Sequence, residues 1–246
     1  MKRVVNLVSS ILKKEMAQKK IHLTYLKIIN KGDLVFDVGS NIGDKTKIFL
    51  DLGANVVSIE PQEACYKILK RRYGNRVLNY LLGYNDRIIL LNKGLNEEEG
   101  YKQLNICETS VLSTMSDKWM KESRFSNAHQ WSKTQLVPVT TLDSLIIKYG
   151  LPKFCKIDVE GFEYPVIKGL KQPIPFISFE FSKELFVETE KCINYLLTLG
   201  NPIFNVSIGE SGEFIFTEWV KSNDVIEYIH TSSDCLLWGD IYVQFS

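Results

Sequence analysis

Uninterrupted apolar runs alternate with amphipathic segments along most of the 246-residue chain. Such runs are typical of strands buried on both faces of a parallel sheet, whereas apolar residues three and four positions apart indicate helices. The predicted strands lie at residues 34–36, 56–59, 87–92, 154–158, 174–181, 204–208 and 235–245. Predicted helices lie at residues 46–52, 63–73, 141–149 and 189–199, and another ends near residue 169. This alternation predicts one doubly wound α/β domain.

The first two predicted strands and the helix between them form a β-α-β unit from Gly32 to Pro61. A glycine turn, from Asp37 through Gly39 to Gly43, joins the first strand to the helix. Glycines let a ligand approach the backbone, and the free N–H groups at the start of the next helix face the same place. In nucleotide-binding units, an acid about 20 residues beyond such a turn binds the ribose diol. Glu60 has that position, so the unit is predicted to bind a nucleoside.

The composition of the turn narrows the choice of nucleoside. Dinucleotide sites use G-x-G-x-x-G, and the middle glycine lets the backbone meet a pyrophosphate. Asn41 stands at that middle position, which argues against NAD or FAD. An acid at the turn, Asp37, suits a ligand that has a ribose, no phosphate and a cationic amino-acid end. S-adenosylmethionine fits this description.

Two further stretches fall at the ligand-binding edge of the predicted sheet. Lys93, Gly94 and Leu95 follow the third strand, where we expect them to border the adenine; the alternative is a plain β-turn that leads into an acidic hairpin loop. Three acids follow the fourth strand, within one short segment: Asp158, Glu160 and Glu163. Ligands of open α/β sheets bind at this edge.

The acids after the fourth strand have four interpretations. Packed like charges raise at least one pKa, which would prepare Asp158 or Glu160 as a general base for an acceptor hydroxyl. One of them can instead contact the sulfonium side of the cofactor or the acceptor. A hard metal ion is a third alternative. The fourth interpretation is that the acids lie at a helix N-terminus, where the helix dipole favours them, and this interpretation is sufficient for Glu163. We predict no resident metal, since the histidines and cysteines are scattered.

The remaining segments interrupt or flank the α/β pattern. Residues 101–135 are rich in hydroxyl, aromatic and basic side chains, and are predicted to be either an acceptor-binding lid or a cover for a sheet edge. Residues 1–30 are predicted to be an amphipathic helical extension that packs over the domain edge or against a second subunit in a homo-oligomer, in preference to a membrane surface. Residues 31–246, without a linker or repeat, form the single predicted domain.

Composition excludes several classes of protein. The formal charge of +1 gives no basic field, so no nucleic-acid partner is predicted. Five scattered cysteines without a C-x-x-C pair indicate reduced thiols and a cytoplasmic protein. No apolar run approaches the roughly 20 residues of a membrane span.

Four blocks, VFDVGSNIGDKT, VVSIEP, VPVTTLDSLI and KIDVEGFEYPVIKGL, together resemble the FkbM-type family of S-adenosylmethionine-dependent methyltransferases over about residues 30–185. The resemblance implies a Rossmann-like class I methyltransferase sheet of seven strands in the order 3-2-1-4-5-7-6, with the last strand antiparallel. It also implies O-methylation of a hydroxyl on a sugar or another small-molecule natural product.

The same resemblance assigns roles to residues. Asp37, Gly39, Asn41 and Gly43 would line the methionine moiety, and Glu60 would hold the ribose. Asp158 and Glu160 would lie under the transferring methyl group. Ser40, where many members have alanine, and Pro61 complete the predicted cofactor site. Methyl transfer would be in line, with Asp158, or Glu160 if the turn points it inward, taking the hydroxyl proton. Two alternatives are an NAD-dependent oxidoreductase on a related fold and a non-catalytic nucleoside-binding protein.

Overall fold

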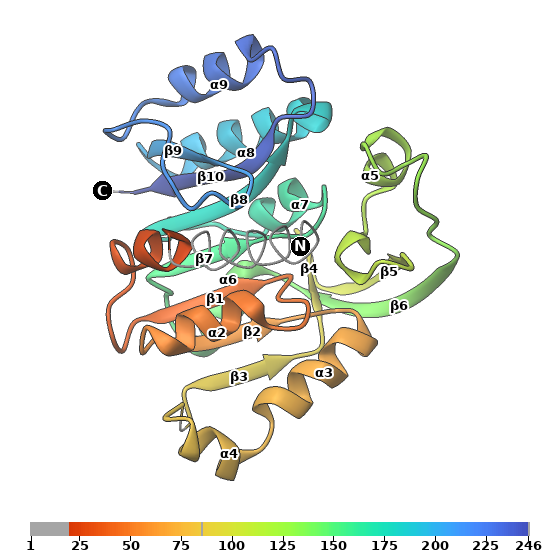
Figure 1. Ribbon diagram of the computed structural model, residues 1–246, viewed down its shortest axis with the longest axis vertical. Coiled ribbons are helices and arrows are strands. Elements are labelled where there is room, and N and C mark those ends of the chain that lie inside the picture. Colours follow the sequence, from red (N-terminus) through yellow and green to blue (C-terminus); the bar gives the residue numbers. More distant parts are fainter. Residues whose placement is uncertain (1–19, 85, 246) are drawn as a thin grey trace, which may run out of the picture.

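A seven-stranded sheet forms the middle layer of the computed structural model, which describes residues 20–84 and 86–245 (Figure 1). Its strand order is β3-β2-β1-β7-β8-β10-β9. Numbered within this sheet alone, that is the predicted order 3-2-1-4-5-7-6, and β10 runs antiparallel to both its neighbours. The predicted fold class is therefore confirmed. The strands are β1 (Leu34–Val38), β2 (Asn55–Ile59), β3 (Ile88–Leu91), β7 (Phe154–Ile157), β8 (Phe176–Ser182), β9 (Ile203–Ile208) and β10 (Trp238–Gln244).

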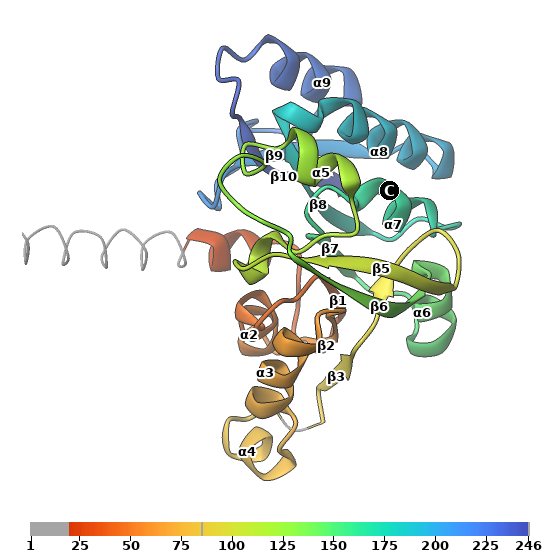
Figure 2. The ribbon, with the colours of Figure 1, turned by 90° about the vertical axis from the view of Figure 1, so that its right-hand side faces the viewer.

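Helices cover both faces of this sheet, because successive side chains of a strand point to opposite faces. Val35 of β1 belongs to a hydrophobic cluster with residues of α2 and α3, whereas Phe36 belongs to the cluster that includes residues of α6, α7, α8 and α9. Figure 2 shows α2 and α3 on one side of the sheet and α6 and α7 on the other. The helices are α2 (Asp44–Asp51), α3 (Glu63–Tyr73), α4 (Arg76–Leu81), α6 (Leu142–Tyr149), α7 (Glu163–Lys168), α8 (Phe186–Leu199) and α9 (Ser222–Thr231).

The described part of the predicted N-terminal extension is helical over residues 20–26 and packs against the core. Tyr25 is buried, and its ring meets that of Phe49 edge to face with 4.9 Å between centroids. Thr24 Oγ1 donates a hydrogen bond to the carbonyl of Gly212. Residues 1–19, which carry most of that predicted helix, lie outside the described residues.

The segment between the third and fourth strands of the main sheet builds a second, three-stranded sheet. Its order is β4-β6-β5, with β4 (Gly94–Leu95) parallel and β5 (Gly100–Ile106) antiparallel to β6 (Lys133–Thr140). A 3-10 turn, η1 (Ser110–Leu112), and the helix α5 (Asp117–Glu122) connect β5 to β6. A small apolar cluster packs Trp119 and Leu112 of this segment against Leu185, which follows β8. None of the described helices is both long enough and apolar enough to cross a membrane.

Candidate functional site

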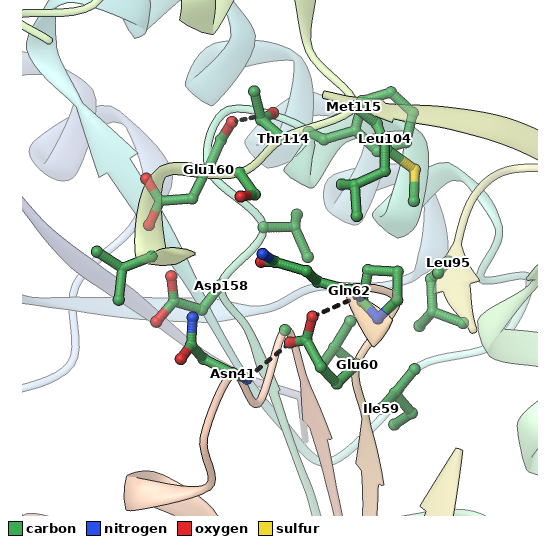
Figure 3. Close-up of a pocket in the computed structure, with 18 of the residues that line it drawn as sticks. Asn41, Ile59, Glu60, Gln62, Leu95, Leu104, Thr114, Met115, Asp158 and Glu160 are labelled. Atoms are coloured by element: carbon green, nitrogen blue, oxygen red, sulfur yellow. Dashed lines mark hydrogen bonds between the residues drawn. The ribbon is translucent and has the colours of Figure 1, made fainter. Parts of the chain in front are cut away.

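A cavity of about 690 Å³, partly open to solvent, lies between the carboxyl ends of β1, β2 and β7 and the second sheet (Figure 3). Leu104, Thr114 and Met115 of the inserted segment line the side away from the main sheet. Most of the residues predicted to bind the cofactor or to act in catalysis line this cavity: Gly39, Asn41, Glu60, Pro61, Lys93, Gly94, Leu95, Asp158 and Glu160. A neighbouring hollow that shares Gly39, Asn41 and Asp158 is lined in addition by Asp37 and Ser40.

Glu60 follows β2 and is held in the cavity wall by two backbone N–H groups. Its Oε2 accepts a hydrogen bond of 2.7 Å from Asn41 N, and its Oε1 one of 2.7 Å from Gln62 N (Figure 3). The residue is only 5% exposed. Burial raises its pKa to about 7, and the two N–H bonds oppose this rise. Each carboxylate oxygen keeps a free lone pair, so the group can still accept two ligand hydroxyls.

Gly39 lets the ends of β1 and β7 approach closely. Its φ of 78° lies in the left-handed region, and a Cβ there would stand 1.8 Å from the carbonyl oxygen of Asp158. Asp158 N in turn donates 3.0 Å to the carbonyl of Val38. Gly43, in contrast, lies at the start of α2, where a Cβ would meet Leu69 and Tyr73. Gly43 therefore lies outside both hollows and lets α2 pack against α3.

Asp37 and Ser40 lie beneath the glycine turn. Asp37 is buried and accepts a hydrogen bond from Thr46 Oγ1, and burial raises its pKa to about 6. Ser40 Oγ accepts 2.8 Å from Ser58 Oγ and donates 3.3 Å to the carbonyl of Ile59. A buried carboxyl at this point gives the neighbouring hollow a negative wall.

An acidic cluster stands at the edge of the cavity, where Asp158 and Glu160 line it and Glu180 adjoins them from a separate hollow. Carboxylate oxygens of Asp158, Glu160 and Glu180 lie within 4.8 Å of one another. Burial, followed by the charges of Asp158 and Glu163, raises the pKa of Glu160 well above its ordinary value. The buried ammonium of Lys156 lies 2.8 Å from Asp158 Oδ2 and 3.6 Å from Asp240 Oδ1. Figure 3 shows Asp158 and Glu160 together, on the side of the cavity away from Leu95.

Two further acids belong to this region. Glu163 lies in the first turn of α7, as expected of a helix N-terminal acid. The Oε1 atom of Glu163 accepts from the backbone N–H groups of Val159 and Gly161, at 3.1 and 3.3 Å, so this side chain shapes its own turn. Glu180, which the sequence reasoning missed, joins the acidic cluster from β8. The available signal was a lone carboxylate within the apolar run of residues 174–181.

A hydrogen bond attaches the inserted segment to the acidic loop. Thr114 Oγ1 donates a hydrogen bond of 2.7 Å to the backbone carbonyl of Glu160 (Figure 3). Farther out, Arg124 forms a two-point ion pair with Glu184, with both N–O distances at 2.7 Å. The segment thus both lines the cavity and is fixed to the main domain.

The strand order, the antiparallel β10 and a cavity at the carboxyl ends of β1 and β2 define a Rossmann-like class I methyltransferase fold. A methyltransferase FkbM domain matches residues 37–224, which is most of the chain. The chain therefore belongs to the FkbM methyltransferase family, as the sequence blocks predict. Family membership also confirms the predicted cofactor, S-adenosylmethionine.

Several solved structures are similar to this chain. A methyltransferase FkbM from Methylobacillus flagellatus KT is 14% identical with a TM-score of 0.54; the match covers 88% of this chain but only 44% of that one. A precorrin-6y C5,15-methyltransferase from Geobacter metallireducens GS-15 is 8% identical with a TM-score of 0.48, over 92% and 87% of the two chains. An O-methyltransferase from Bacillus cereus, solved with SAH, is 11% identical with a TM-score of 0.47, over 93% and 81%. No curated protein matches this chain.

Proposed function

We propose that this protein transfers the methyl group of S-adenosylmethionine to a hydroxyl oxygen of a small-molecule acceptor, such as a sugar or another natural product. One observation carries the proposal: Glu60 and the pair Asp158 and Glu160 face the same cavity from the ends of β2 and β7, the two strands that flank β1. A ribose-binding carboxylate and an acid pair on one cavity are what methyl transfer to a hydroxyl needs.

The residues present fit the cofactor. Glu60 would accept hydrogen bonds from the ribose diol, with Pro61 and the stretch from Lys93 to Leu95 beside the adenine. Asp37, Gly39, Ser40 and Asn41 would surround the amino-acid end. The cavity also has acidic groups suited to a sulfonium, because Glu60, Asp158 and Glu160 line it.

The acid pair would activate the acceptor. When bound, S-adenosylmethionine supplies an electrophilic methyl group: a C–O bond forms, the C–S bond breaks and its electron pair stays on sulfur. Asp158 Oδ2 already accepts a hydrogen bond from Lys156, whereas no hydrogen bond within the described chain reaches the carboxylate of Glu160. We therefore assign the hydroxyl proton to Glu160, with Asp158 orienting the acceptor. The sequence alone favours Asp158 as the base and leaves Glu160 as the alternative.

Calorimetric titration of the purified protein with S-adenosylmethionine and with NAD(H) tests the first half of the proposal. We expect only the former to bind, and the reverse result would favour an oxidoreductase. Methyl-labelled cofactor incubated with a panel of glycosides and polyketide alcohols tests the second half. Nuclear magnetic resonance of a labelled product distinguishes an O-methyl from an N- or C-methyl group. Bound but unreacted cofactor with every class of acceptor would support a non-catalytic binding protein.

A further inference from the structure

We propose that Asp158, Glu160 and Glu180 form a binding site for one hard divalent cation, Mg²⁺, Mn²⁺ or Ca²⁺, at the acceptor side of the cavity. The three side chains come from two places in the chain: Asp158 and Glu160 lie in the turn that follows β7, and Glu180 belongs to β8. Each contributes one carboxylate oxygen, and these oxygens lie within 4.8 Å of one another.

The separation fits oxygen ligands of a single ion. Two ligands on opposite sides of one ion are about 4.2 Å apart for Mg²⁺ and about 5 Å apart for Ca²⁺, given their usual metal–oxygen distances. Carboxylate oxygens are also the ligands that these cations prefer. A closer approach of the three side chains would suit Mg²⁺ or Mn²⁺, and the larger Ca²⁺ would need less of it.

An independent observation comes from a single atom. Glu180 Oε2 has no contact with solvent and no hydrogen-bond partner among the described residues. A buried carboxylate oxygen without a partner is costly and therefore uncommon. Its nearest acidic neighbours, Asp158 and Glu160, add negative charge and cannot donate to it when ionised. A cation between the three groups would satisfy this oxygen.

When the carboxyl groups of the cluster are ionised, the charges around it also favour a cation. Lys156 is the buried ammonium in contact with it, and it is shared between Asp158 and Asp240. One positive charge therefore faces three carboxylates of the cluster and a fourth on β10. A divalent ion would bring the buried group close to neutrality, which buried charges need to be stable.

The ion would take one oxygen from each carboxylate and leave further coordination positions for acceptor oxygens. This role rests on the proposed methyl transfer, whereas the site itself does not. A coordinated hydroxyl is held close to its base, and the second oxygen of Glu160 remains available for the proton. The acceptor would then be a molecule with two neighbouring oxygens, as in a sugar diol, because two oxygens can bind one ion.

Calorimetric titration of the chelator-treated full chain with Mn²⁺, and separately with Ca²⁺, tests the inference without cofactor or acceptor. We expect one ion per chain, and at least tenfold weaker binding in Glu180→Gln. Glu227→Gln, on the exposed side of α9, makes the same change of charge and should bind as the wild type does. S-adenosylmethionine affinity should be the same in all three proteins, which shows that the variants are folded.

Wild-type protein that binds no ion at millimolar concentration would overturn the inference, as would equal affinity in Glu180→Gln. If Glu180→Gln does not fold, Glu160→Gln removes a second ligand from a more accessible turn and should give the same tenfold loss. The two proposals fail separately. Full methyl transfer in the presence of chelator would keep the proposed function and refute the role of the ion in it, whereas ion binding without methyl transfer would keep the site and refute the function.

Discussion

Replacing Glu60 with glutamine isolates the contribution of one carboxylate to cofactor binding. The change keeps the size of the side chain but removes its charge and turns one of its two acceptors into a donor. That donor would face the N–H of Asn41 or Gln62, which now bond to Glu60 at 2.7 Å. The ribose would lose hydrogen bonds to a charged group. Such bonds contribute about 1.5–3 kcal/mol, so affinity for S-adenosylmethionine should fall about 10- to 150-fold.

The pH dependence sharpens this prediction. Because burial raises the pKa of Glu60 to about 7, the carboxyl is mostly protonated at pH 6 and mostly ionised at pH 7.5. If the ionised form binds the ribose, affinity should rise up to about eightfold between these two pH values. The suitable ligand is 5′-methylthioadenosine, which keeps the ribose but has no amino group that titrates nearby.

Calorimetry at several pH values would measure both effects. Other groups face Glu60, namely Asp37, Asp158 and the thiol of Cys65, so the informative quantity is the difference between wild type and Glu60→Gln. Glu63→Gln, an exposed neighbour on α3, is the matched control and should retain the wild-type profile. An unchanged affinity in Glu60→Gln, or an eightfold rise that persists in it, would refute the ribose assignment.

Three further predictions concern stability and catalysis. The folded protein holds the Glu60 proton up to about pH 7, whereas an unfolded chain releases it near 4.5, so stability falls as pH rises between these values. Measured in urea, the free energy of unfolding of the wild type should fall by up to about 3 kcal/mol relative to that of Glu60→Gln between pH 4.5 and 8. The same pH dependence in both proteins would contradict this. Gly39→Ala should lower the free energy of unfolding by more than about 2 kcal/mol, because backbone strain and a clash with Asp158 combine. Gly32→Ala is the control for strain alone, since Gly32 has a φ of 92° and no neighbour within 4 Å. Equal losses of stability in the two variants would exclude the clash. Glu160→Gln should lower methyl transfer at least tenfold while cofactor affinity is kept, and wild-type turnover would exclude a base role.

The sequence predicts the main sheet well, because buried parallel strands and their crossover helices carry strong local patterns. The helix expected at residues 63–73 is α3 with the same bounds, and the expected cap at Thr141 accepts a hydrogen bond from Ser144 N at 3.0 Å. Glu60 was found because its place after a strand is fixed by the length of the β-α-β unit. These signals are local and do not depend on distant pairing.

The features that the sequence did not predict depend on distant residues. The parallel pair of β4 and β6 joins Gly94 to Val139 across the whole insertion, and no local pattern specifies such a partner. Whether Glu180 is a defect in a core strand or a member of a site depends on its register beside β10, where it pairs with Asp240. The position of Gly43 in the sequence suggests a ligand-binding glycine, but the packing of α2 against α3 explains equally well why a glycine stands there.

The placement of β10 also bears on how this protein is made. It is the last described strand of the chain, yet it lies between β8 and β9, and β9 joins the main sheet only through it. Asp240, one of the two carboxylates paired with Lys156, arrives on the same strand. On the ribosome, an emerging chain would hold an open hydrophobic edge at β8 until residues 238–244 are released. Interrupted translation products should therefore be recognised by chaperones and degraded rather than accumulate as partly active enzyme.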